Sequence, residues 1–272
     1  MSLFTDEGAL RSFCARILGW SIERVGAVEH ALRSIEFAAA HRAALVLLGE
    51  TNLVSIAHAL HRRMFGAGQP FVVCNPRLGN MPASSRSPAN YESAVEAIGA
   101  AATGSLCVDR RRLPRDFSAA VAMIRHPDTR VQLVICRGRH DKHEALLEAM
   151  APIQVPSLQE RAAELPRIVE EYAMDAAAAL SSTAPITSND RDWICRCCAS
   201  SLCEIETTTL RVVALHEAGN TVRAAKLLGL PHGSLEEWLQ RHRPRWTSAP
   251  RRRASEPSAP RPRPSAIRRP SQ

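Results

Sequence analysis

The sequence has no run of eighteen apolar residues, which speaks against a membrane-spanning helix. Its first residues also lack the basic segment and following apolar stretch that mark a secretory signal. Both absences predict a cytoplasmic protein without a membrane partner. Lysine is almost missing too, because only Lys142 and Lys226 occur among 35 basic residues. We attribute this bias to genomic base composition rather than to a functional choice of guanidinium groups.

The eight cysteines lack the spacing of a paired metal-binding knuckle. Four of them are clustered, at Cys195, Cys197, Cys198 and Cys203, but they do not form two Cys-x-x-Cys motifs and no His lies near them in the sequence. Without a secretory signal we expect free thiols. Buried cysteine behaves as a small apolar residue, so we expect no metal site here.

The net charge of +8 is concentrated at the C-terminal end. Residues 241–272 hold ten Arg and one Glu, a net charge of +9, so residues 1–240 sum to about −1. Residues 244–272 are rich in Pro, Ser, Ala and Arg and are expected to be disordered. Such an arm can bind phosphates without reading sequence. The alternative is an inert tail.

Short apolar runs alternate with helical periodicity over the first half of the chain. Strands are expected at 43–48, 70–74, 105–109 and 131–136, and helices at 3–20, 26–41, 55–64 and 116–125. This alternation predicts an α/β fold, a parallel sheet with crossover helices.

The segment 206–241 reads as three short helices joined by two sharp turns. The helices are expected over Glu206–Ala218, Thr221–Leu228 and His232–Arg241. Gly219 and Gly229 can take the left-handed conformation that ends a helix. Asn220 is placed to cap the second helix. A helix at 190–203 is expected just before, packed either on its own chain or against its copy in a second subunit.

This segment resembles the Fis-type DNA-binding domain, a helix-turn-helix that commonly closes bacterial enhancer-binding proteins. The matching residues are Gly219-Asn220, Ala224-Ala225, Leu228-Gly229-Leu230 and Ser234-Leu235. The alternative is a plain helical bundle end. By position, the residues expected to contact DNA are Asn220, Arg223, His232, Ser234 and Arg241. Glu236 and Glu237 stand where the family is usually basic, which weakens the expectation of specific contacts.

Residues of about 25–180 resemble the AAA+ domain of sigma-54-dependent activators. The matching pieces are LLGETN at 47–52, IAHALHRR at 56–63, QPFVVCN at 69–75, GSLCVDRRRLP at 104–114, TRVQLVICRGR at 129–139 and PIQVPSLQERAAELPRIVEEY at 152–172. The last piece is the most specific. The family's sigma-contacting G-A-F-T-G-A loop is missing between the third and fourth pieces.

The resemblance implies a nucleotide site whose motifs are degenerate here. Its remnants are Gly49, Glu50, Thr51, Asn52, Ser55 and Asp109. The family's loop G-E-[ST]-G-T-G-K has lost both later glycines, and Ser55 replaces its Lys, so we expect no charge to remain for a triphosphate. The Glu that polarises water is replaced by Arg110, which cannot act as a base.

The sequence therefore predicts a truncated AAA+ sheet domain, an all-α helix-turn-helix domain and a tail. The expected divisions are an N-terminal helix at 1–24, a degenerate core at 25–150, a remnant lid or connector at 151–185, the helix-turn-helix at 186–243 and the tail at 244–272. The function expected is a homodimeric transcriptional regulator that binds specific sequences of double-stranded DNA and has no enzymatic activity. No cofactor is expected, except ATP if the degenerate site still binds it. Two alternatives stay open: an active ATP-dependent sigma-54 activator, or a non-DNA-binding partner of an intact relative.

Overall fold

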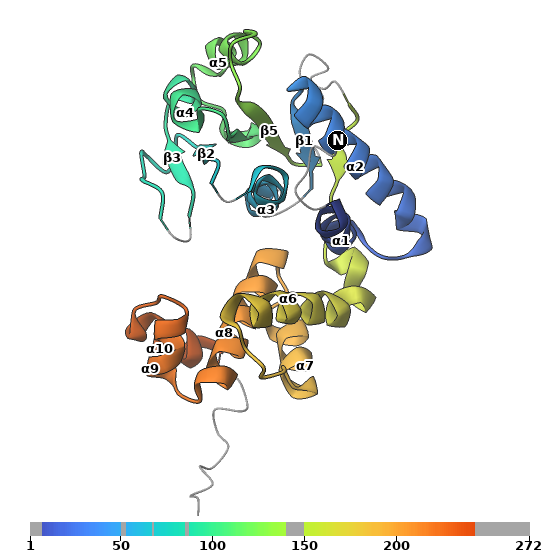
Figure 1. Ribbon diagram of the computed structural model, residues 1–272, viewed down its shortest axis with the longest axis vertical. Coiled ribbons are helices and arrows are strands. Elements are labelled where there is room, and N and C mark those ends of the chain that lie inside the picture. The colour runs from blue at the N-terminus through green and yellow to red at the C-terminus, as the bar shows by residue number, and fades with distance from the viewer. Residues whose placement is uncertain (1–6, 50–52, 67, 85–86, 140–149, 243–272) are drawn as a thin grey trace, which may run out of the picture.

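The computed structural model describes residues 7–49, 53–66, 68–84, 87–139 and 150–242. An α/β unit built on a six-stranded sheet is followed by a helical unit, which lies against one side of it (Figure 1). Among the described residues, no helix is long and apolar enough to cross a membrane.

The sheet is parallel throughout its strand pairings, as the sequence predicted. Its strands are β1 (Leu45–Leu48), β2 (Phe71–Cys74), β3 (Ala89–Tyr91), β4 (Ser105–Asp109), β5 (Gln132–Arg137) and β6 (Ile153–Gln154), in the order β3-β2-β4-β5-β1-β6. The four strands expected from apolar runs are confirmed. The two edge strands, β3 and β6, were not predicted, because three and two residues are too few to show a pattern.

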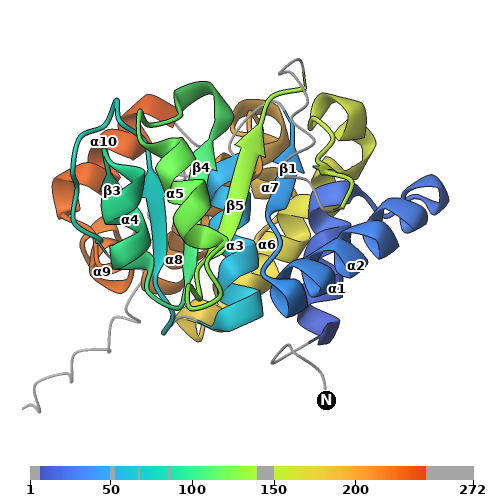
Figure 2. The same cartoon turned by 90° about the horizontal axis from the view of Figure 1, so that it is seen from above.

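Helices cover both faces of the sheet (Figure 2). One face carries α1 (Glu7–Leu18), α2 (Val25–His41) and α3 (Leu53–Phe65), and the other carries α4 (Ala94–Ala101) and α5 (Phe117–Ile124). Side chains of a strand alternate between the faces. Leu45 and Leu47 accordingly enter the first core, and Val46 enters the second. Among the described residues, short 3-10 turns are formed by Ile22–Arg24, Arg110–Arg112 and Gln159–Glu164.

The helical unit consists of α6 (Leu165–Leu180), α7 (Ser188–Cys197), α8 (Leu202–Ala218), α9 (Thr221–Leu227) and α10 (His232–His242). Its apolar side chains, including Ile168 and Ile205, belong to the same buried cluster as Leu60 of α3. Arg16 of α1 adds an ionic link, because its buried guanidinium lies 2.5 Å from the half-exposed carboxylate of Asp175 in α6. The helical unit is thus held against the sheet by one continuous core.

The expectation of one helix over 190–203 is wrong, because the helical conformation is interrupted between α7 and α8. Helix α7 ends at Cys197, and α8 begins at Leu202 rather than near 206. Ser201 causes the new start: its hydroxyl accepts a hydrogen bond from the backbone N–H of Glu204 at 3.1 Å. A hydroxyl that caps free amides favours a helix end over a helix interior.

Candidate nucleic-acid interface and sheet-edge pocket

The two joints between α8, α9 and α10 have the local geometry expected from the sequence. Gly219 ends α8 with φ +68°, and Gly229 follows α9 with φ +60°, both in the left-handed region that favours glycine. Asn220 caps α9, because its side-chain oxygen accepts from the backbone N–H of Arg223 at 2.9 Å. The turn, the cap and the helix order therefore agree with a helix-turn-helix arrangement.

Small and aromatic side chains fix how α9 and α10 pack. Ala224 and Ala225 are buried on the inner face of α9, where their small size lets the helices approach closely. Leu235 and Trp238 are the buried residues of α10. Trp238 also meets Trp193 of α7 edge to face, with ring centroids 6.2 Å apart. The orientation of α10 is consequently fixed by α7 as well as by α9.

Of the five residues predicted to contact DNA, three have exposed side chains and two have side chains that already make contacts within the chain. Arg223, Ser234 and Arg241 are exposed on α9 and α10. The side chain of Asn220 caps α9, so a phosphate near this position would be contacted by neighbouring groups instead. The Nε2 atom of His232 lies 3.2 Å from the hydroxyl of Thr221, which ties the start of α10 to α9.

Acidic residues share the exposed surface of α10. Glu236 approaches the His232 ring at 3.3 Å, and Glu237 lies 3.7 Å from the guanidinium of Arg241. Both carboxylates are exposed, so these pairs are weak in water. Near DNA each carboxylate would repel phosphates while partly neutralising its basic neighbour.

A pocket of about 260 Å³ lies at the carboxyl ends of β1, β4 and β5, the edge where open α/β sheets commonly bind ligands. It is lined by Gly49, Leu53, Val54, Ser55, Asp109, Arg111, Arg112, Cys136, Arg137 and Gly138. Three predicted remnants of the nucleotide site, Gly49, Ser55 and Asp109, are thus brought together. The other three, Glu50, Thr51 and Asn52, lie outside the described residues.

Packing alone favours a glycine at position 49, whether or not a ligand binds. Its N–H donates to the carbonyl of Arg137 at 3.0 Å, which continues the β1–β5 pairing. A Cβ atom at this position would lie 2.9 Å from Leu53 and 3.2 Å from the carbonyl oxygen of Val155. A glycine after β1 is therefore not by itself a sign of nucleotide binding.

Asp109 acts on the backbone. Its Oδ1 atom accepts from the N–H of Arg111 at 3.0 Å and so caps the 3-10 turn that follows β4. The turn carries the guanidinium of Arg111 against Gly138, where an added Cβ would lie 2.0 Å from the Arg111 Nη2. The carboxylate thus organises an arginine-bearing turn at the mouth of the pocket.

The expectation that no charge remains for a phosphate is wrong for the pocket as a whole. The loop after β1 carries no Lys, but Arg111, Arg112 and Arg137 reach the same pocket from the ends of β4 and β5. Sequence reasoning treated the arginine run only as the loss of a Glu. Guanidinium groups can bind phosphate oxygens in pairs of hydrogen bonds, although they cannot act as bases.

Two carboxylates have structural roles that were not predicted from the sequence. Asp116, which directly precedes α5, accepts hydrogen bonds from the hydroxyl of Ser93 at 2.7 Å and from the N–H groups of Ala94 and Val95 at 3.0 Å. Its carboxylate therefore caps α4. Asp190 is buried at the start of α7 and pairs with His216 of α8. Neither partner could be read from sequence spacing, since both contacts are long-range.

No model of a known protein family matches this sequence, and a search of the curated proteins finds no match either.

Proposed function

We propose that this chain is a DNA-binding transcriptional regulator, related to sigma-54-dependent activators but without ATP hydrolysis. The observation that carries the proposal is the α8–α9–α10 unit, with glycines at both joints and an Asn cap on α9. In a helix-turn-helix the second helix enters the major groove with its N-terminal residues, while neighbouring groups hold the backbone phosphates. Helix α10 takes the recognition role and α9 the positioning role.

The contact residues follow from exposure. Ser234 lies exposed in the first turn of α10 and is placed to meet a base edge or phosphate. Arg223 and Lys226 of α9 are exposed and supply phosphate contacts. Arg241 contributes from the last turn of α10. His232 contacts DNA only by exchanging its present contact with Thr221, so its first role is to hold α10 against α9.

Each such unit reads one half-site, so the regulator acts as a homodimer on double-stranded DNA. The location that fits this function is the cytoplasm. The α/β unit serves as a scaffold and requires no cofactor. An intact AAA+ relative or sigma-54 remains an alternative partner, favoured by the two carboxylates of α10, which oppose tight DNA binding.

A second function is favoured by the arginines of the sheet-edge pocket: binding of a nucleotide without hydrolysis. Arg111, Arg112 and Arg137 provide the positive charge for a phosphate chain. Arg110 replaces the residue that would activate water, so turnover is not expected. Calorimetric titration of the full chain with Mg²⁺ and ATP tests this function. Heat of binding that Arg137→Ala abolishes supports it, and absent heat in the unmodified chain dismisses it.

The DNA proposal is tested by selecting duplexes from a random-sequence pool with the full chain and measuring affinity by fluorescence anisotropy. Ser234→Ala is expected to relax the selected sequence, and Arg223→Ala to weaken all duplexes roughly tenfold and lower the salt slope by about 1. Arg33→Ala, on the exposed side of α2, is the matched control and should change nothing. Recovery of no preferred sequence, or equal effects from Arg33→Ala and Arg223→Ala, would reject the proposal.

A further inference from the structure

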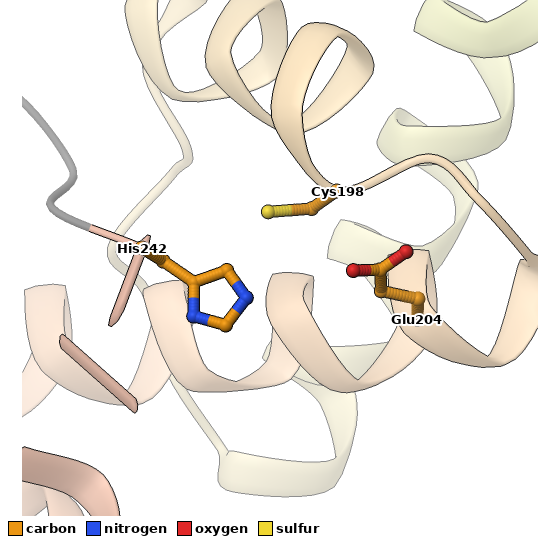
Figure 3. Close-up of side chains that lie close together, drawn as sticks. All are labelled: Cys198, Glu204 and His242. Atoms are coloured by element: carbon orange, nitrogen blue, oxygen red, sulfur yellow. The ribbon is translucent and has the colours of Figure 1, made fainter. Parts of the chain in front are cut away.

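Three potential metal ligands meet where the last helix ends. The Sγ atom of Cys198, a carboxylate oxygen of Glu204 and a ring nitrogen of His242 all lie within 4.8 Å of one another (Figure 3). Cys198 follows α7, Glu204 lies in the first turn of α8, and His242 ends α10. The expectation that no His lies near the cysteines therefore holds along the sequence and fails in space.

The ring of His242 is already oriented as a ligand. Its Nδ1 lies 2.9 Å from the backbone carbonyl of Trp238, which can only accept, so Nδ1 carries the hydrogen and donates. In the neutral ring the lone pair is then on Nε2. A backbone carbonyl that fixes the tautomer in this way is the usual outer partner of metal-bound histidine. Trp238 further holds the ring by stacking, with centroids 5.0 Å apart.

The carboxylate of Glu204 is also held in place. Its Oε2 atom accepts hydrogen bonds from the backbone N–H of Ser200, at 3.0 Å, and from the hydroxyl of the same residue. The backbone N–H of Glu204 donates in return to Ser201. These bonds fix the side chain, and a carboxylate with one oxygen engaged keeps lone pairs for a cation on the other.

Cys198 completes the donor set from a buried position. Burial raises the pKa of its thiol to about 11, although a hydrogen bond with Thr208 acts in the opposite direction. The thiol is thus protonated at neutral pH, and a metal that binds the sulfur must displace this proton.

We propose that Cys198, Glu204 and His242 bind one Zn²⁺ ion, with water as the fourth ligand. A thiolate, an imidazole and a carboxylate suit zinc, whereas Mg²⁺ and Ca²⁺ prefer oxygen ligands alone. Zinc bonds of about 2.0–2.3 Å place tetrahedral ligands about 3.5 Å apart, so the donors need to close in by about 1 Å. A cavity of about 450 Å³ bordered by Glu204 and His242 has room for the water.

The charge around the cavity sets a limit on affinity. Arg211 and Arg241 also line it, and their guanidinium groups repel a cation. The thiolate and the carboxylate together balance the charge of the zinc ion, so the complete site is neutral. The ion would clamp the C-terminal end of α10 to the α7–α8 junction, and this inference stands whether or not α10 contacts DNA.

The test is titration of the reduced, metal-free full chain with Zn²⁺ by calorimetry and with Co²⁺ by absorbance. One ion per chain is expected, with the thiolate-to-cobalt charge-transfer band and the visible bands of tetrahedral Co²⁺. Cys198→Ser should remove the charge-transfer band and weaken Zn²⁺ binding by about a hundredfold or more. Cys197→Ser, one residue away and exposed, is the matched control and should bind as the unmodified chain does.

His242→Ala and Glu204→Gln complete the test. Gln has nearly the same shape as Glu, so the Glu204→Gln chain keeps the test valid if His242→Ala does not fold. Each is expected to weaken Zn²⁺ binding by about tenfold or more. Failure of the unmodified chain to bind one Zn²⁺ would overturn the proposal. So would a charge-transfer band that persists in Cys198→Ser, or full affinity in a folded Glu204→Gln chain.

Discussion

The Nε2 atom of His216 in α8 lies 3.0 Å from the Oδ2 of Asp190, a carboxylate only 1% exposed at the start of α7. The hydrogen bond to Asp190 raises the pKa of His216, although burial opposes it. Burial alone would raise the pKa of Asp190, but hydrogen bonds from His216 and Thr187 outweigh it and lower that pKa. The pair therefore couples the α7–α8 packing to pH.

His216→Ala is expected to destabilise the chain most in mildly acidic solution. A histidine whose folded pKa is raised stabilises the fold fully below its unfolded pKa of about 6.5 and loses this effect as pH rises through the folded value. Asp190 contributes above about pH 3.9 and loses its effect at lower pH. We predict a loss of about 2 kcal/mol near pH 5.5, shrinking toward pH 9, in urea unfolding curves.

The control for this measurement is His126→Ala. His126 also lies near an aspartate, 3.5 Å from Asp128, but both side chains are largely exposed. Its removal should change the free energy of unfolding by less than about 0.5 kcal/mol at any pH. A His216 variant with a pH-independent loss would contradict the ionic interpretation and leave a packing effect.

Gly104 offers a test of the packing at the amino ends of β2 and β4. A Cβ atom there would lie 1.8 Å from the carbonyl oxygen of Pro70, a backbone atom that cannot move without disturbing β2 and β4. Gly104→Ala should therefore reduce the free energy of unfolding by about 3 kcal/mol. Gly99→Ala is the matched control, because Gly99 is exposed within α4 with open space around it. That variant should gain up to about 1 kcal/mol. Equal effects at the two sites would contradict the close approach.

Local signals explain which parts of the fold were predictable. The joints at Gly219 and Gly229 depend on residues next to one another, and the central strands are apolar runs, so both can be read from sequence. Helix α8 was placed four residues late although Ser201 and Glu204 form a Ser-x-x-Glu capping pattern. The sequence prediction instead continued the preceding helix through the apolar cysteines to Cys203 and missed this cap.

Contacts across the sheet and between helices were not predictable in this way. Arg137 reaches the pocket because β5 pairs with β1 in a register that places it beside Leu48. His242 meets Cys198 only because α10 folds back over the α7–α8 junction. A single sequence carries no local pattern for either contact, since each depends on the packing of elements far apart in the chain.

Glu237→Gln is expected to strengthen DNA binding. The carboxylate lies on exposed α10, 3.7 Å from the guanidinium of Arg241, and repels phosphates while competing for that group. Its removal should raise affinity about threefold in low salt and leave the preferred sequence unchanged. Glu96→Gln, exposed on α4, is the control. Weaker binding confined to duplexes with cytosine at one position would instead assign Glu237 to a cytosine amino group.

The basic C-terminal segment can be tested separately from the helical unit. Residues 243–272 contain nine Arg and one Glu, and the truncation 1–242 removes them while keeping all five helices of that unit. If the segment holds phosphates, truncation should flatten the salt dependence of DNA binding by about 0.9 for each phosphate that the segment neutralises. Affinity for random duplexes should fall more than that for the selected sequence, because interactions with the DNA backbone carry no sequence information.

Charge and chain length are separated by a second variant, in which the nine arginines of 243–272 become glutamine. It should match the truncation in both salt slope and affinity, because counterion release depends on charge. An unchanged slope in both variants would mean that the segment is inert and that Arg223, Lys226 and Arg241 supply the phosphate contacts. In that case the specificity ratio, which is the affinity for the selected duplex divided by the affinity for a random duplex, should also stay constant. A rise in that ratio on truncation therefore distinguishes a phosphate-binding arm from an inert one.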